Sequence, residues 1–149
     1  CPGAGAFESL RLEKGYRSLG SDIHSNTNPY ESGLGFTVTL KKDVDFIGKD
    51  ALSNIKEAPI QKKLACMVLE DPEGIALGTE PIYSDGKAVG YVTSTNYGYY
   101  VDKHIVYGYL PSELSSTGTK LELEYFGKRY PLTVTTEPLL DPENSRLKS

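Results

Sequence analysis

The stretch PIYSDGKAVGYVT, residues 81–93, decides the fold of this chain. Its Asp85-Gly86 pair stands between two arms rich in β-branched and aromatic residues. An Asp-Gly pair readily adopts the positive φ angles that a tight hairpin turn demands. We therefore predict a β-hairpin that turns at residues 85 and 86.

Further strand patterns lie on both sides of this hairpin. KLACMVLE (63–70) and HIVYGYL (104–110) have the length and composition of buried strands. TKLELEYF (119–126) and YPLTVT (130–135) predict a second hairpin, joined by residues 127–129. Five or more short strands with frequent turns are typical of a small antiparallel barrel or sandwich. We expect a Greek-key-like β-barrel.

The residues before Pro59 have a mixture of helix and strand patterns. Residues 3–14 predict a short helix that ends near Gly15, where a left-handed cap would fall. LGFTVTL (34–40) alternates apolar residues with threonines, which predicts a half-buried strand. FIGKDALSNIKEA (46–58) has apolar residues at helical intervals and predicts an amphipathic helix of about ten residues that opens near Gly48.

These patterns indicate an α+β chain that is mainly β. We divide it into a helix–strand–helix part at residues 1–58, a barrel at 59–141 and a charged tail at 142–149. Pro59 marks the boundary because almost everything after it reads as strand and turn. A length of 149 residues allows one domain, or one domain with a remnant of another.

Composition excludes several classes of function. The net charge of −4 gives no bulk positive field for nucleic acid or an anionic membrane, so we expect neither as a partner. No apolar run approaches the roughly 20 residues of a membrane span. Cys1 and Cys66 have no zinc-binding spacing and favour a reducing compartment. A lipid-modified Cys1 is a minor alternative.

The sequence offers no self-contained active site. It contains no HExxH, GxSxG or phosphate-binding glycine loop, and we expect no catalytic or metal-ligating residue. Tyrosine is unusually frequent, with eleven against four Phe and no Trp. Three tyrosines, Tyr97, Tyr99 and Tyr100, fall in TSTNYGYYVDKH (93–104), which we interpret as a loop. They are equally typical of a stacking surface for a flat ligand and of a half-buried barrel wall.

Arg11 is the second candidate for binding. It lies between two leucines of the first predicted helix, so its planar guanidinium can be held along a wall and presented to a carboxylate or a heterocycle edge. The alternative is an intrahelical ion pair with Glu8, three residues earlier. Glu13 and Glu31 are other possible structural partners.

Four segments together resemble one known family. SLRLEKGYRSLGSDI (9–23), TNPYESGLGF (27–36), DFIGKDAL (45–52) and GYVTSTNYGYYVDKHIVYGYL (90–110) are similar to the C-terminal portion of the aminomethyltransferase family. That family includes the T-protein of the glycine cleavage system and the folate-binding half of dimethylglycine and sarcosine dehydrogenases and oxidases. The first and third segments are closer to the dimethylglycine and sarcosine enzymes.

The resemblance implies a site shared with other polypeptide. Family members bind tetrahydrofolate in a central hole walled by three subdomains, and the folate captures a methylene unit. The family's acidic residues for this step lie upstream of the motifs found here. The resemblance therefore implies partners in the missing upstream part of the folate domain and in a flavin-binding domain, with FAD bound outside this chain. It implies a bacterial cytoplasmic or mitochondrial matrix location.

Position by position, the resemblance assigns three cofactor-binding residues. Arg11 falls on the family's arginine near the pterin, and Tyr97 and Tyr100 fall in the loop that faces the central opening. Residues 94–96 read Ser-Thr-Asn where the family usually has Ser-Gly, so the loop departs from the family here. Glu31 matches a family glutamate that we expect to be structural.

The resemblance gives one leading function and two alternatives. We expect a C-terminal part of a tetrahydrofolate-binding unit in a dimethylglycine- or sarcosine-oxidising flavoenzyme, part of an enzyme but not catalytically complete alone. A positioned carboxylate is needed to stabilise a cationic methylene donor, and none stands out here. The alternatives are a non-catalytic regulatory or scaffolding module of the same family and a fragment of a glycine cleavage T-protein.

Overall fold

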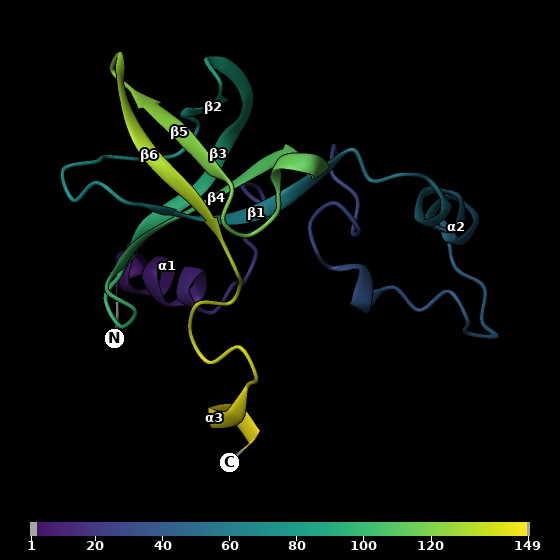
Figure 1. The fold of residues 1–149 in the computed structure, drawn as a ribbon. Coiled ribbons are helices and arrows are strands. Elements are labelled where there is room, and N and C mark those ends of the chain that lie inside the picture. Colours follow the sequence, from purple (N-terminus) through teal and green to yellow (C-terminus); the bar gives the residue numbers. More distant parts are fainter. Residues whose placement is uncertain (1–2, 149) are drawn as a thin grey trace.

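A closed six-stranded antiparallel barrel dominates the computed structural model, which describes residues 3–148 (Figure 1). Around the barrel the strands follow the order β1-β4-β3-β2-β5-β6. This order confirms the predicted mainly β class and the antiparallel barrel. The strands are β1 (Lys62–Leu69), β2 (Pro81–Ser84), β3 (Lys87–Gly98), β4 (Lys103–Pro111), β5 (Lys120–Tyr125) and β6 (Lys128–Thr135).

Helices lie outside the barrel. The helices are α1 (Ala4–Glu13), α2 (Lys49–Glu57), the short α3 (Ser145–Lys148) and the 3₁₀ turns η1 (Gly35–Thr37) and η2 (Ser112–Leu114). The two predicted helices are therefore present. No helix within residues 3–148 is long and apolar enough to cross a bilayer.

The end of α1 follows the predicted cap. Gly15 has φ 72°, the amide of Tyr16 donates to the carbonyl of Arg11 at 2.8 Å, and the amide of Gly15 donates to that of Leu12 at 3.1 Å. This pair of bonds is a Schellman motif, which needs a residue with positive φ and so favours glycine.

The first hairpin turns where the sequence predicts it. Asp85 has φ 49° and Gly86 has φ 77°, and the flanking residues Ser84 and Lys87 pair directly. The second hairpin turns at residues 126 and 127, not at 127–129, because residues 128 and 129 already pair with β5. Positive φ angles at both Phe126 and Gly127 supply this tighter turn.

The predicted strand at 34–40 is wrong. Residues 35–37 form the 3₁₀ turn η1, and the rest of the segment has no regular structure. The side chain of Phe36, expected on a buried face, is 83% exposed. A strand needs a neighbour for its backbone groups, and the described residues place no other strand beside this segment.

Two apolar clusters share the strands of the barrel. The interior is filled by side chains from all six strands, including Met67, Ile82, Val92, Val106, Leu121, Leu123, Leu132 and Val134. The second cluster lies outside the barrel and contains Leu12, Leu64, Cys66, Ile105, Tyr107 and Tyr109. Because side chains alternate along a strand, β1 is buried on both faces, inward at Met67 and outward at Cys66. Burial raises the pKa of the Cys66 thiol to about 12.

Candidate functional site

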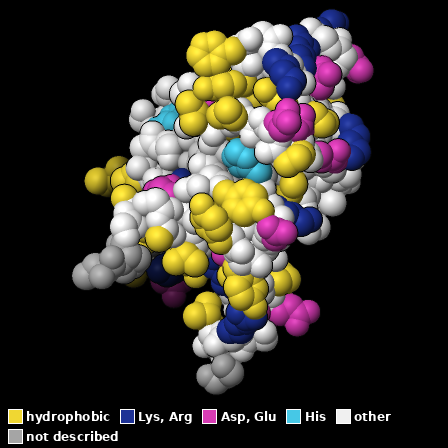
Figure 2. Space-filling view, turned by 90° about the vertical axis from the view of Figure 1, so that its left-hand side faces the viewer, with side chains coloured by type: hydrophobic (Ala, Val, Ile, Leu, Met, Phe, Trp, Pro, Cys, Tyr) yellow, Lys and Arg dark blue, Asp and Glu magenta, His cyan; other side chains and the backbone are white. Residues whose placement is uncertain are grey.

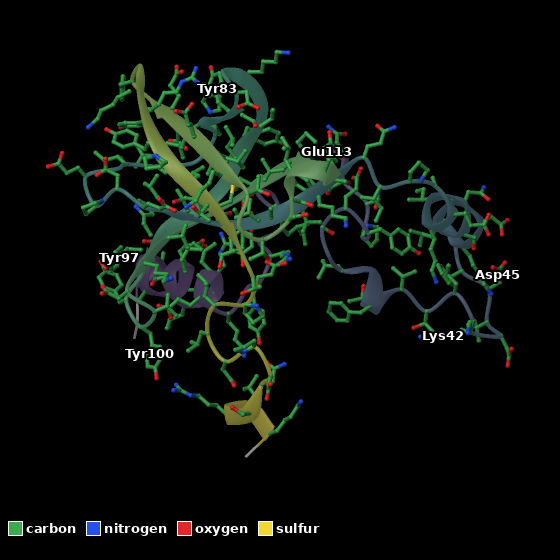
Figure 3. The ribbon with its side chains drawn as sticks, viewed as in Figure 1. Lys42, Asp45, Tyr83, Tyr97, Tyr100 and Glu113 are labelled. Carbon is green, nitrogen blue, oxygen red and sulfur yellow. The ribbon has the colours of Figure 1, made fainter. Side chains whose placement is uncertain are left out.

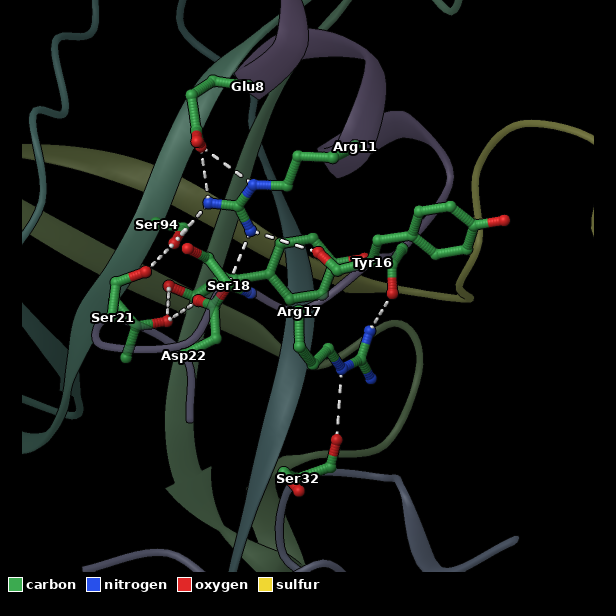
Figure 4. Close-up of polar contacts among 12 residues, drawn as sticks. Glu8, Arg11, Tyr16, Arg17, Ser18, Ser21, Asp22, Ser32 and Ser94 are labelled. Atoms are coloured by element: carbon green, nitrogen blue, oxygen red, sulfur yellow. Dashed lines mark hydrogen bonds and ion pairs between the residues drawn. The ribbon is translucent and has the colours of Figure 1, made fainter. Parts of the chain in front are cut away.

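Arg11 lies in a buried polar network between α1 and the barrel (Figure 4). Its Nη1 donates to Asp22 Oδ2 at 2.6 Å and to the carbonyl of Tyr16 at 3.2 Å. Its Nη2 donates to Ser94 Oγ at 2.8 Å and lies 2.7 Å from Glu8 Oε2, which also accepts from Nε. A guanidinium has five N–H groups; four of them donate hydrogen bonds here, and Nη2 also takes part in the ion pair with Glu8.

Asp22 is the anion at the centre of this network. Its side chain is buried, and Oδ2 also accepts from the amide of Ser18 at 3.0 Å while Oδ1 accepts from Thr93 Oγ1 at 2.6 Å. The hydroxyl of Tyr109 donates to its carbonyl at 2.9 Å. These contacts attach the loop after α1 to β3 and β4. The sequence alone does not single out Asp22, since nothing local distinguishes it from a solvated turn residue.

One of the three glutamates expected to be structural partners of Arg11 pairs with it, and the other two do not. The pair with Glu8 is present, whereas Glu13 and Glu31 bind elsewhere. The carboxylate of Glu31 accepts from the amide of Asn28 at 3.1 Å, within its own loop. The contact of Arg11 with a pterin stays a prediction.

Glu13 holds the turn between β3 and β4. Its buried carboxylate accepts from the amides of Tyr100 at 2.7 Å and Val101 at 3.4 Å. One turn earlier on α1, Ser9 Oγ donates to the carbonyl of Tyr97 at 2.6 Å. We call these three bonds the clamp. The clamp fixes the position of the tyrosine-rich turn relative to α1.

Tyr97 lies in a strand and not in the predicted loop. Strand β3 runs to Gly98, so only residues 99–102 form the turn. The hydroxyl of Tyr97 donates to the carboxylate of Asp102, and this bond raises the tyrosine pKa. Its ring meets that of Tyr99 edge to face, with centroids 5.1 Å apart. Figure 3 shows Tyr97 and Tyr100 near the same end of the hairpin.

Tyr100 lies in the turn as predicted and is 61% exposed. The guanidinium of Arg146 donates to its hydroxyl and lies over its ring, with Cζ 4.9 Å from the centroid. The C-terminal segment therefore touches the same tyrosine that α1 positions through Glu13.

A hollow of about 590 Å³ lies between α1 and the turn. It is lined by Gly5, Ala6, Ser9, Leu10, Glu13, Asn96, Tyr99 and Tyr100. Its volume falls within the range of small-molecule sites, and small residues on one wall face aromatic rings on the other. We call it the helix hollow. Figure 2 views the side of the molecule where α1 and this turn lie and shows hydrophobic side chains spread over that face.

A second hollow of about 540 Å³ lies on the other side of the turn. Tyr97, Asp102 and His104 line it together with residues at the end of β1. The structure therefore separates the three predicted site residues: Tyr100 lines the helix hollow, Tyr97 the second hollow, and Arg11 neither. Within residues 3–148, no group of three or more His, Cys, Asp or Glu side chains is arranged to hold a metal ion.

His104 gives the second hollow a pH-dependent group. Burial lowers its pKa below the ordinary value, and its Nε2 lies 3.1 Å from Thr95 Oγ1. Because the unfolded chain binds the proton more readily, stability is expected to rise with pH through about 6.5 and to fall on acidification. Urea unfolding between pH 5 and 8 should show this rise, and His104→Gln should flatten it. An unchanged profile in the variant would contradict the assignment.

Two family models match this chain. The glycine cleavage T-protein C-terminal barrel domain matches residues 62–141, more than half of the chain, and the GCVT N-terminal domain matches residues 1–42. The chain belongs to the glycine cleavage T-protein family. The two matched regions meet in space at the clamp, where α1 holds the hairpin of the barrel.

Named relatives include enzymes of two kinds. Mouse mitochondrial dimethylglycine dehydrogenase is 40% identical over 148 residues, covering 98% of this chain and 17% of that protein. An aminomethyltransferase of Prochlorococcus marinus (strain NATL1A) is 38% identical over 136 residues, covering 91% of this chain and 36% of the relative. The crystal structure of aminomethyltransferase T of the glycine cleavage system from Bartonella henselae matches with a TM-score of 0.82 at 27% identity, over 92% of this chain and 38% of that one. The chain thus spans about a sixth to two fifths of these relatives.

Proposed function

We propose that this chain forms part of a tetrahydrofolate-binding unit in a dimethylglycine- or sarcosine-oxidising flavoenzyme. The match to dimethylglycine dehydrogenase over nearly the whole chain supports this assignment. FAD would be bound by a domain outside residues 1–149. The family's locations make the mitochondrial matrix or the bacterial cytoplasm the proposed compartment. Residues 1–58, 59–141 and 142–149 remain our proposed division of the chain.

The observation that carries the proposal is the helix hollow. A pterin is flat and aromatic, and Tyr99 and Tyr100 offer exposed rings at a fixed place beside α1. Gly5 on the facing wall has open space around it, which leaves room for a ring. Bound tetrahydrofolate would supply the nitrogen that accepts a one-carbon unit. The chain would supply the stacking surface and exclude water.

Arg11 would support the wall of this site rather than bind the ligand first. Its guanidinium can reach a ligand only by giving up a present contact, and the pair with Glu8 is the easiest to exchange because the Glu8 side chain is 42% exposed. The bonds to Asp22 and Ser94 are buried and hold the β3 strand. We therefore assign Arg11 first to the support of the wall, and contact with a pterin second.

No side chain in the helix hollow is set up to drive the chemistry alone. Its carboxylate, Glu13, is already bound to two backbone amides and is buried. A cationic methylene donor needs a free, positioned anion to stabilise it. We propose that this anion comes from other polypeptide and that the chain alone does not turn over.

The test uses a chimaera in which this chain replaces the aligned 148 residues of mouse dimethylglycine dehydrogenase. Tetrahydrofolate is titrated into the chimaera by calorimetry. Tyr100→Ala is expected to weaken binding about 2- to 13-fold, because a stacked aromatic pair contributes about 0.5–1.5 kcal/mol. Tyr100→Phe keeps the ring and should bind nearly as well.

Phe126→Ala is the matched control, since Phe126 is an exposed aromatic at the β5–β6 turn and lines no part of the helix hollow. It should leave the affinity unchanged. Equal affinity in Tyr100→Ala and the parent chimaera would remove the helix hollow from the folate site.

A stand-alone aminomethyltransferase is the second candidate. The relative of that name is 38% identical, only slightly less than the dehydrogenase. The native polypeptide decides between the two functions. Mass spectrometry that finds a flavin-binding sequence joined to this chain would support the dehydrogenase, and a stand-alone chain of aminomethyltransferase length would support the transferase.

A further inference from the structure

The segment after β6 returns to the end of α1. Residues 136–148, which we call the strap, leave the barrel and run past α1 to α3 in Figure 1. The amide of Leu140 donates to the carbonyl of Glu13 at 2.9 Å, and Lys14 Nζ donates to the carbonyl of Asp141 at 2.7 Å. Lys14 Nζ also lies 3.4 Å from Asp141 Oδ2. These contacts anchor the strap to the same end of α1 that holds the tyrosine-rich turn through Glu13.

The anchored residue Asp141 also fixes the start of α3. Its Oδ1 accepts hydrogen bonds from the amide of Ser145 at 2.8 Å and from Ser145 Oγ at 2.7 Å, and its Oδ2 accepts from the amide of Arg146 at 3.2 Å. These bonds, of which the one from the serine hydroxyl has the largest effect, lower the pKa of the Asp141 carboxyl to about 2. The carboxylate is therefore charged at neutral pH and holds the backbone of Arg146 in place relative to α1.

The side chain of Arg146 reaches from the strap to Tyr100. Its guanidinium donates to the tyrosine hydroxyl and lies over the ring, with Cζ 4.9 Å from the centroid. A guanidinium is planar and can both stack on an aromatic face and donate from its edge. The amide of Tyr100 is held separately by Glu13 Oε1 at 2.7 Å. The contacts of Arg146 therefore restrict the ring, whereas the bond to Glu13 restricts the backbone.

The ring of Tyr100 stands between two hollows. One is the helix hollow, and the other, of about 580 Å³, lies beside the strap, where Arg146, Lys103 and Asp141 are among the residues that line it. Tyr100 lines both hollows, but Arg146 lines only the one beside the strap. In Figure 3 Tyr100 lies toward α3, whereas Tyr97 lies farther from it. Arg146 thus approaches the ring from the strap and leaves the side toward the helix hollow to a ligand.

Order in an exposed aromatic ring affects the affinity of a site that uses it. The side chain of Tyr100 is largely exposed, and a tyrosine has three staggered χ1 rotamers. In the rotamer of this structure the ring lines the helix hollow. If loss of Arg146 let the three rotamers become equally populated, roughly one third of the molecules would be competent to bind, and the apparent affinity would fall about 3-fold.

We propose that Arg146 is a positioning residue for the ligand of the helix hollow. It holds the Tyr100 ring from the strap side, so that the ring is already in place when a flat ligand stacks on its other side. Arg146 itself does not touch the ligand. This role rests on the proposed folate site, whereas the ordering of the ring can be tested without any ligand.

Nuclear magnetic resonance of the 149-residue chain tests the ordering of the ring. Three-bond couplings of the Tyr100 side chain are expected to report one χ1 rotamer in the parent and rotamer averaging in Arg146→Ala. Lys148→Ala is the matched control, because it removes another cation of α3, whose Nζ donates to the carbonyl of Glu143. It should leave the couplings of Tyr100 unchanged.

Two results of this measurement would contradict the role of Arg146. Averaged couplings in the parent, or a single rotamer in Arg146→Ala, would overturn the proposal. Fast exchange of the Leu140 amide in Arg146→Ala would also overturn it, since the arginine would then hold the strap as a whole rather than the ring.

Titration of tetrahydrofolate into the chimaera with the mouse enzyme tests the consequence for binding. Arg146→Ala is expected to weaken binding about 3-fold where Tyr100 is present and to have no effect in the Tyr100→Ala background, because the effects of residues that act through one another are not additive. No loss where Tyr100 is present, or the same loss in both backgrounds, would overturn the proposal. Equal affinity of Tyr100→Ala and the parent would overturn the folate assignment and with it this role in folate binding, while the couplings judge the ordering of the ring independently.

Discussion

Replacing Asp22 with alanine is expected to lower the free energy of unfolding by about 3–5 kcal/mol, because it removes the buried anion beside a buried guanidinium and leaves only the partly exposed Glu8 to pair with it. Asp22 and Arg11 are both buried and lie 2.6 Å apart. The same change leaves the hydroxyl of Thr93 and the amide of Ser18 without their acceptor. Chemical denaturation of the 149-residue chain measures the loss.

Glu70→Ala is the matched control for Asp22→Ala. Glu70 pairs with Lys120 at 2.6 Å, but both side chains are largely in solvent. Exposed pairs contribute about 0–1 kcal/mol, so this variant should remain close to the parent. A loss below 1 kcal/mol for Asp22→Ala would show that the network does not hold the loop to the barrel.

Replacing Glu13 with alanine is expected to cost about 1–3 kcal/mol, because two backbone amides lose a buried carboxylate acceptor. The turn at residues 99–102 should then move more freely, so the amide of Tyr100 should exchange faster with solvent. In the chimaera, the affinity for tetrahydrofolate should fall as the turn becomes less ordered. Denaturation and amide exchange of the same variant give both readouts.

Glu13→Gln keeps an oxygen acceptor of the same reach and is the control. It should retain most of the protection at Tyr100. Slow exchange at Tyr100 in Glu13→Ala would mean that other contacts order the turn and that the clamp is not what positions it.

The barrel is predictable from the sequence because its signals are local. Asp85-Gly86 fixes the first hairpin, alternation marks the strand faces, and Gly15 marks the end of α1. The exact second turn is less clear, since Phe126 adopts a positive φ that its residue type does not announce.

The site is harder to predict because its contacts join distant parts of the chain. Glu13 and Tyr100 are 87 positions apart, and Arg11 and Ser94 are 83 apart. The place of Arg11 between two leucines predicts a guanidinium held along a wall, but it cannot reveal that Asp22 binds that guanidinium. The segment 34–40 illustrates the opposite case, since its pattern is that of a strand while the structure forms the 3₁₀ turn η1 there and places no strand of the described residues beside it.

The clamp joins side chains of the helix to main-chain atoms of the hairpin. Ser9 binds the carbonyl of residue 97, and Glu13 binds the amides of residues 100 and 101. Peptide groups are the same whatever side chains they carry. Evolution can therefore exchange the tyrosines at these positions, and with them the preferred ligand, while the loop keeps its place against the helix.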